Sequence, residues 1–218
     1  MKERQFLIGD VLPQNLLARL HGTEGRRPAA VEFPAAVMFI DVSRYTALVE
    51  QLARRGREGL GDLPNILSLS YGRCSEYVAD LGGEVVYFAG DSLIAYWVAD
   101  SDQNLGSAVR SAVACAEMIC RSGDDRKHHG LSDIAPALHV GIGAGPIWAA
   151  ALGENSLWNL IAGGAAITQA AASQAFARSW TYEMSVEAKA ALAQAHASAK
   201  TRSRRVSLLG PAGAVCAL

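Results

Sequence analysis

The chain has 218 residues, of which 50% are hydrophobic, and its formal net charge is −1. This length and apolar content suit one large globular domain, alone or with an arm. The near-neutral charge argues against a nucleic-acid surface or an anionic membrane as partner, and no apolar run approaches the roughly 20 residues of a membrane span. The N-terminus has no secretory apolar core, so the sequence predicts a cytoplasmic protein with reduced cysteines.

The beginning of the chain predicts an arm followed by a domain. Leucines repeat at helical spacing after Pro13, which indicates a short amphipathic helix in an arm over residues 1–30. Residues 31–218 then form the domain. Its first predicted elements are a buried strand, a helix with Ser43 as N-cap, and a glycine-rich loop, over residues 35–41, 44–55 and 55–62.

The stretch L-G-G-E-V-V-Y-F-A-G-D-S-L-I-A-Y-W follows a long helix predicted from Pro64 to about Leu81. Its two apolar, β-prone runs, Glu84–Ala89 and Ser92–Val98, flank Gly90-Asp91 and predict a hairpin with a tight turn. Asp91 therefore occupies a turn between buried strands. An aspartate in such a turn is often purely structural, because it caps its own backbone.

A second aspartate has a similar setting and favours a functional interpretation. Asp41 ends the apolar run in A-A-V-M-F-I-D-V-S-R-Y-T and precedes a helical pattern. Two carboxylates at strand ends are the ligands that a divalent-cation site for phosphate chemistry uses. The pair therefore predicts a metal site that neither residue predicts alone.

The second half of the chain alternates helices and strands. The predicted elements are a helix, a polar loop, a hairpin, a strand, a helix, a strand, a helix and a last strand, at residues 103–121, 122–130, 136–152, 156–161, 164–176, 180–184, 185–196 and 205–209. The motif G-I-G-A-G precedes Pro146, so no helix N-terminus follows to bind a dinucleotide pyrophosphate. Its glycines instead predict close approach of a strand to a helix or a ligand. The overall order predicts an α/β sandwich of ferredoxin-like type, with helices packed on a mixed β-sheet.

The segments M-F-I-D-V-S-R-Y-T and G-G-E-V-V-Y-F-A-G-D-S-L-I-A-Y-W resemble the two metal-binding motifs of class III nucleotidyl cyclases. Within that family they are most like the first cyclase half of soluble, bicarbonate-responsive adenylyl cyclases and their bacterial relatives. The resemblance extends roughly from Ala35 to Leu209. It implies the cyclase homology fold and a pair of domains arranged head to tail, with the nucleotide at their interface.

The resemblance also implies a site. Asp41 and Asp91 would hold two Mg²⁺ or Mn²⁺ ions on the triphosphate, with the backbone at Ile40 and Val42 beside the metals. The ions would help to deprotonate the ribose 3′-hydroxyl and would stabilise charge as pyrophosphate leaves. The residues implied to surround the nucleotide are Ser43, Arg44, Tyr45, Thr46, Tyr87 and Gly90.

The chain departs from the family on the other side of the site. Catalytic halves carry an Asn and, four residues on, an Arg; aligned through Gly163, these positions hold Ile167 and Ala171. The adenine-selecting Asp and Lys are replaced by Gly164 and Tyr87. The chain thus has the pattern of the metal-donating half of a heterodimeric cyclase. Because Tyr87 replaces the lysine that holds bicarbonate in responsive relatives, bicarbonate binding is not expected.

Three functions remain open. The first is a metal-donating half that converts ATP to cAMP when a second cyclase domain supplies Asn and Arg; a homodimer would lack both. The second is an inactive module that dimerises and regulates a partner. The third is a cyclase with altered base choice, since Tyr87 would stack rather than hydrogen-bond. We expect the small-residue segment Gly163–Ala171 to lie at the partner surface, the alternative being an ordinary helix on its own sheet.

Overall fold

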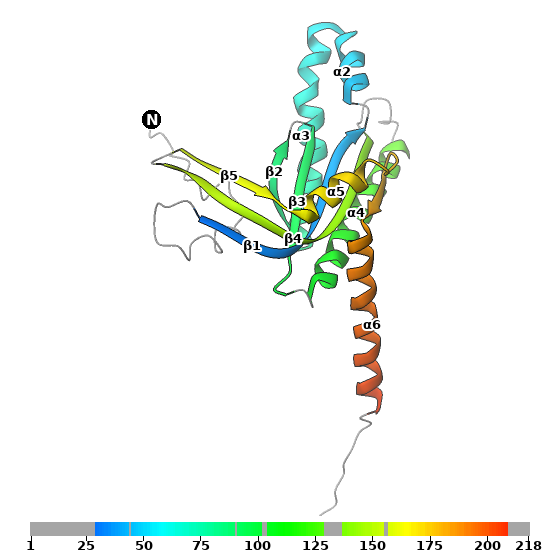
Figure 1. Cartoon of the computed structure of the whole chain (residues 1–218). Coiled ribbons are helices and arrows are strands. Elements are labelled where there is room, and N and C mark those ends of the chain that lie inside the picture. The colour runs from blue at the N-terminus through cyan, green and yellow to red at the C-terminus, as the bar shows by residue number, and fades with distance from the viewer. Residues whose placement is uncertain are drawn as a thin grey trace, which may run out of the picture.

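The computed structural model describes residues 29–208 except 44, 90, 102–103, 129–136 and 155–156. Residues 1–28 of the predicted N-terminal arm, Arg44 and Gly90 therefore lie outside the described residues, and the last two residues of that arm, 29 and 30, belong to β1. The described strands form one sheet in the order β2-β3-β1-β4-β5, with β6 paired to β4 (Figure 1). Neighbouring strands are antiparallel except for the parallel pair β4–β6, which confirms the predicted mixed sheet. Their bounds are β1 Ala29–Ser43, β2 Glu84–Ala89, β3 Ser92–Val98, β4 Ala137–Glu154, β5 Leu157–Gly163 and β6 Thr181–Met184.

Helices cover both faces of this sheet. Side chains of α3, α4 and α6 pack on one face and those of α5 on the other. The described helices are α2 Tyr45–Ala53, α3 Gly56–Asp80, α4 Leu105–His128, α5 Ala165–Gln174 and α6 Val186–Leu208. Within the described ranges, every helix is too short or too polar to cross a bilayer.

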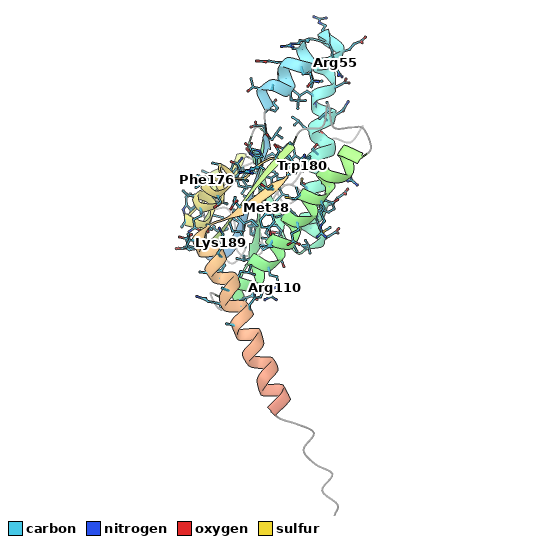
Figure 2. All side chains as sticks on the ribbon, turned by 90° about the vertical axis from the view of Figure 1, so that its right-hand side faces the viewer. Met38, Arg55, Arg110, Phe176, Trp180 and Lys189 are labelled. Atoms are coloured by element: carbon cyan, nitrogen blue, oxygen red, sulfur yellow. The ribbon has the colours of Figure 1, made fainter. Side chains whose placement is uncertain are left out.

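The central strand β1 supplies both apolar layers because its side chains alternate between the two faces. Met38, Ile40 and Val42 are buried against α3 and α4, and Figure 2 shows Met38 in the middle of the domain. Phe33 and Val37 are buried on the α5 side. Each such side chain contributes on the order of 1.5–3 kcal/mol when fully buried, so β1 anchors the residues that follow it, including Asp41.

The hairpin predicted over residues 136–152 is wrong. β4 runs without a turn through this segment, pairs with β1 along its length, and forms its hairpin with β5 instead. The glycines have a packing reason: a Cβ on Gly141 would lie 2.0 Å from the Ala170 carbonyl oxygen, and one on Gly143 would lie 2.1 Å from that of Ala166. Strand β4 and helix α5 therefore approach more closely than any side chain permits, which confirms the prediction of a close strand–helix approach.

Three other boundaries also differ from the prediction. The glycine-rich loop at 55–62 is the beginning of α3, where a Cβ on Gly59 would lie 2.3 Å from the Leu52 carbonyl oxygen. This glycine lets α3 pack against α2. The polar loop at 122–130 is helical as far as His128. The last predicted strand belongs to α6 as far as Leu208, so this helix continues well beyond its alanine-rich first half.

Replacing Gly141 with alanine is expected to lower the free energy of unfolding by about 3 kcal/mol, because the new Cβ meets the backbone of α5 and no side chain can move away. Gly72 offers a control, since it is exposed in the middle of α3 and a Cβ added there would have no atom within 4 Å. Gly72→Ala should raise stability by about 0.5–1 kcal/mol. Urea denaturation measures both, and equal effects would contradict the close packing.

Candidate metal and nucleotide site

Asp41 is the last residue of β1 that pairs with β3, where it lies opposite Ser92. Its side chain is half-exposed and accepts two hydrogen bonds. The Ser92 hydroxyl donates to Oδ1 over 2.8 Å, and the Gln174 amide nitrogen donates to Oδ2 over 3.3 Å. The carboxylate is therefore held from β3 on one side and from α5 on the other.

Asp91 lies in the tight turn between β2 and β3, next to the closing pair Ala89↔Ser92. Its carbonyl oxygen accepts a hydrogen bond from the Val42 N–H over 3.3 Å and another from the Tyr71 hydroxyl on α3. Its carboxylate forms no hydrogen bond with any described residue, and the side chain is half-exposed. The backbone of this turn is thus fixed while its carboxylate stays available to a ligand.

Both aspartates lie close enough to Tyr71 to affect its ionisation. Burial raises the pKa of the Tyr71 hydroxyl above its ordinary value, and the negative charges of Asp41 and then Asp91 raise it further. No described Arg or Lys pairs with either aspartate; the ion pair among the described residues joins Arg121 to Glu117 on the surface of α4. The strand ends at β1 and β3 therefore carry two adjacent, uncompensated negative charges.

This donor set fits a hard divalent cation. Mg²⁺ takes oxygen ligands and in nucleotide sites uses one or two carboxylates, with phosphates and water completing its shell. Across the described ranges, no three His, Cys, Asp or Glu side chains come together as a closed metal cage. Two half-exposed carboxylates suit an ion that is shared with a bound phosphate better than an ion held by the protein alone.

Comparison with solved structures shows which fold this chain has. No family model matches the sequence. The adenylyl cyclase CyaB from P. aeruginosa superposes with a TM-score of 0.63 at 17% identity, over 76% of this chain and 83% of that one. The guanylyl cyclase Cya2 gives 0.62 at 16% identity, over 75% and 80%. A class III adenylyl cyclase-like ATP-binding protein from Pseudomonas aeruginosa gives 0.62 at 19% identity, over 74% of this chain and 35% of its own. The chain has the class III cyclase fold.

A curated relative agrees with the structures and confirms the predicted resemblance. Adenylate cyclase type 10 of Oryctolagus cuniculus is 29% identical over 156 residues, which is 70% of this chain. The match covers 9% of that protein, so this cyclase-homology domain spans about a tenth of its relative's length. The ferredoxin-like mixed sheet with flanking helices is likewise confirmed.

The other residues that the resemblance places around the metals lie beside the two aspartates. The side chains of Ile40 and Val42 are buried, and both residues are paired to β3 or its turn through the main chain. The Ser43 hydroxyl lies 3.5 Å from that of Ser179. Tyr45 packs partly into the core at the start of α2, and the next residue, Thr46, is exposed there. A role in binding metal or nucleotide stays a prediction for each.

The positions that the resemblance assigns to adenine selection, Gly164 and Tyr87, have a structural reason for their residue types. Gly164 precedes α5 at φ +131, and a Cβ there would lie 2.7 Å from the Pro146 carbonyl oxygen. No aspartate fits this backbone without moving it, since L-residues avoid such dihedrals. Tyr87 and Ile167 both pack partly into the apolar layer between the sheet and α5. Neither Tyr87 nor Ile167 has a charged side chain that could bind a nucleotide base.

Gln174 and Ser92 were missed by the sequence analysis. Ser92 follows Asp91 directly, but its bond goes to Asp41, its cross-strand neighbour. The predicted hairpin places Ser92 next to Asp91, but its position opposite Asp41 depends on the register between β1 and β3, which the hairpin does not determine. Gln174 is 133 positions from Asp41 along the chain, so no local pattern links them. Contact between them exists because α5 packs over the same face of the sheet to which Asp41 points.

Proposed function

We propose that this cyclase-homology domain is the metal-donating half of a class III nucleotidyl cyclase. The observation that carries the proposal is the placement of Asp41 and Asp91 at adjoining strand ends, half-exposed and without a described cationic partner. A module that only dimerises has no need of both.

In this function each residue has a limited task. Asp41 and Asp91 would bind two Mg²⁺ or Mn²⁺ ions that also contact the triphosphate. The chemistry supplied by such ions is activation of the ribose 3′-hydroxyl and stabilisation of charge on the phosphates as pyrophosphate leaves. The Tyr71 hydroxyl and the Val42 N–H hold the turn that carries Asp91. Ser92 and Gln174 hold the Asp41 carboxylate.

The proposed substrate is ATP, the product cAMP and the partner a second cyclase domain. Ile167 and Ala171 have no side-chain donor, so the Asn and Arg of the catalytic half would come from that partner. Similarity to an adenylate cyclase supports ATP. The buried thiols of Cys74 and Cys115 suit a reducing compartment, and the cytoplasm also contains the triphosphate.

Two alternatives rest on specific observations. The loss of both donors at Ile167 and Ala171 also fits a regulatory module that binds nucleotide without turning it over. One structural neighbour is named as a class III adenylyl cyclase-like ATP-binding protein. Tyr87 in place of a lysine favours a cyclase that selects another base by stacking.

Titration calorimetry tests the metal dependence of nucleotide binding and the choice of base, while turnover with a second cyclase domain separates the metal-donating half from a regulatory module. Non-hydrolysable analogues of ATP, GTP, CTP and UTP are titrated into the chain with Mn²⁺ and again with EDTA. We expect binding of the ATP analogue that requires Mn²⁺. A preference for another triphosphate supports altered base choice. Equal binding in EDTA, or none under either condition, contradicts a metal-donating half.

A further inference from the structure

The Asp41 carboxylate is oriented by two donors from parts of the chain that are remote in sequence. Ser92 belongs to β3 and donates to Oδ1, while Gln174 is the last residue of α5 and donates to Oδ2. An ionised carboxylate has about four acceptor positions on its two oxygens. One hydrogen bond on each oxygen therefore fixes the plane of the group and leaves a lone pair on each for a cation.

The position of Gln174 relative to Asp41 depends on backbone packing between α5 and β4. A Cβ on Gly141 would lie 2.4 Å from the Gln174 nitrogen and 2.8 Å from its Cα, so this end of α5 rests directly on β4. Gly141 is paired with Phe39 of β1, two residues before Asp41. The end of α5 therefore cannot move closer to the sheet, and from this position the Gln174 amide reaches the Asp41 carboxylate.

We propose that Gln174 is a positioning residue, which orients Asp41 for a divalent cation through its amide group. The inference rests on the proposed metal-donating function. Carboxylates that bind metals are usually hydrogen-bonded in turn, and loss of such a partner typically weakens metal affinity about 10–100-fold. A purely structural glutamine would instead stabilise the end of α5 and leave the affinity unchanged.

The test compares Gln174→Met with the wild-type chain. Methionine has nearly the same length and no donor, so the helix end keeps its packing while the bond to Asp41 is lost. We expect the Kd for Mn²⁺, measured by calorimetry with a non-hydrolysable ATP analogue present, to rise about 10–100-fold. Gln174→Asn, which keeps the amide but is one methylene shorter, should give the same loss. Thermal unfolding of both variants checks that they are folded.

Gln169 provides the matched control on the same helix. Its amide oxygen accepts hydrogen bonds from the Ala144 N–H and the Ser185 hydroxyl, each over 3.1 Å, and its side chain makes no bond to Asp41. Gln169→Met should lower the melting temperature and leave the Mn²⁺ affinity unchanged. Equal losses of Mn²⁺ affinity in the two methionine variants contradict the positioning role of Gln174 but not the proposed function. An unchanged Mn²⁺ affinity in Gln174→Met has the same consequence. Absence of Mn²⁺ binding by the wild-type chain overturns the proposed function with it.

Discussion

Assayed alone with Mn²⁺ and ATP, the chain is expected to form cyclic nucleotide at least about 10⁴-fold more slowly than when mixed with a cyclase domain that supplies Asn and Arg. A pair of identical chains presents Ile167 and Ala171 in both sites. The loss of one transition-state donor typically costs on the order of 10²–10³ in rate, and two donors are missing here. Pyrophosphate release and cAMP formation, measured for the chain alone and for the mixture, give the ratio directly.

A change on the outer side of α5 tests where the partner binds. Ala172 is exposed on this helix, so Ala172→Glu should leave the domain folded and remove activation by the second domain. Ile167 is less suitable, because it packs partly into its own core and a charge there would disturb the fold.

Both experiments have an outcome that contradicts the proposal. Turnover by the chain alone at about 1 s⁻¹ or faster contradicts the heterodimer. Full activation of Ala172→Glu removes α5 from the shared surface.

Asp91→Asn is expected to abolish Mn²⁺-dependent nucleotide binding with little change in stability. The carboxylate accepts no hydrogen bond from the described residues, while the backbone that Tyr71 and Val42 hold is retained. Asp41→Asn should abolish binding as well, but at a cost of about 1–3 kcal/mol in stability, because an amide NH₂ would then face one of two donors. Calorimetry and urea denaturation on the same preparations measure both quantities.

The exposed Asp100, which follows β3, serves as the control for charge. Asp100→Asn removes the same charge away from the site and should leave nucleotide binding as in the wild-type chain. If Asp91→Asn binds the Mn²⁺–nucleotide complex as tightly as the wild type, Asp91 is only a turn residue. The metal-donating function then fails, although the fold is unaffected.

Features that depend on neighbouring residues could be predicted from the order of the amino acids alone. The β2–β3 hairpin has the bounds predicted for it, because two β-prone runs around Gly-Asp leave the backbone few alternatives. The sequence also predicted the placement of Asp41 and Asp91 at strand ends. The resemblance to class III cyclases, carried by the segments around the same two aspartates, is confirmed by a curated relative, and the fold by the structural neighbours.

The roles of the glycines and of the late helix depend instead on how the layers pack. The run G-I-G-A-G was expected in a hairpin, yet it lies inside β4 where α5 approaches, since a glycine permits a turn and a close contact equally well. That contact also determines the reach of Gln174 and, through it, the orientation of Asp41. Asp41 and Gln174 are 133 positions apart and interact because the sheet and α5 pack together. No short-range sequence pattern predicts a contact of this kind.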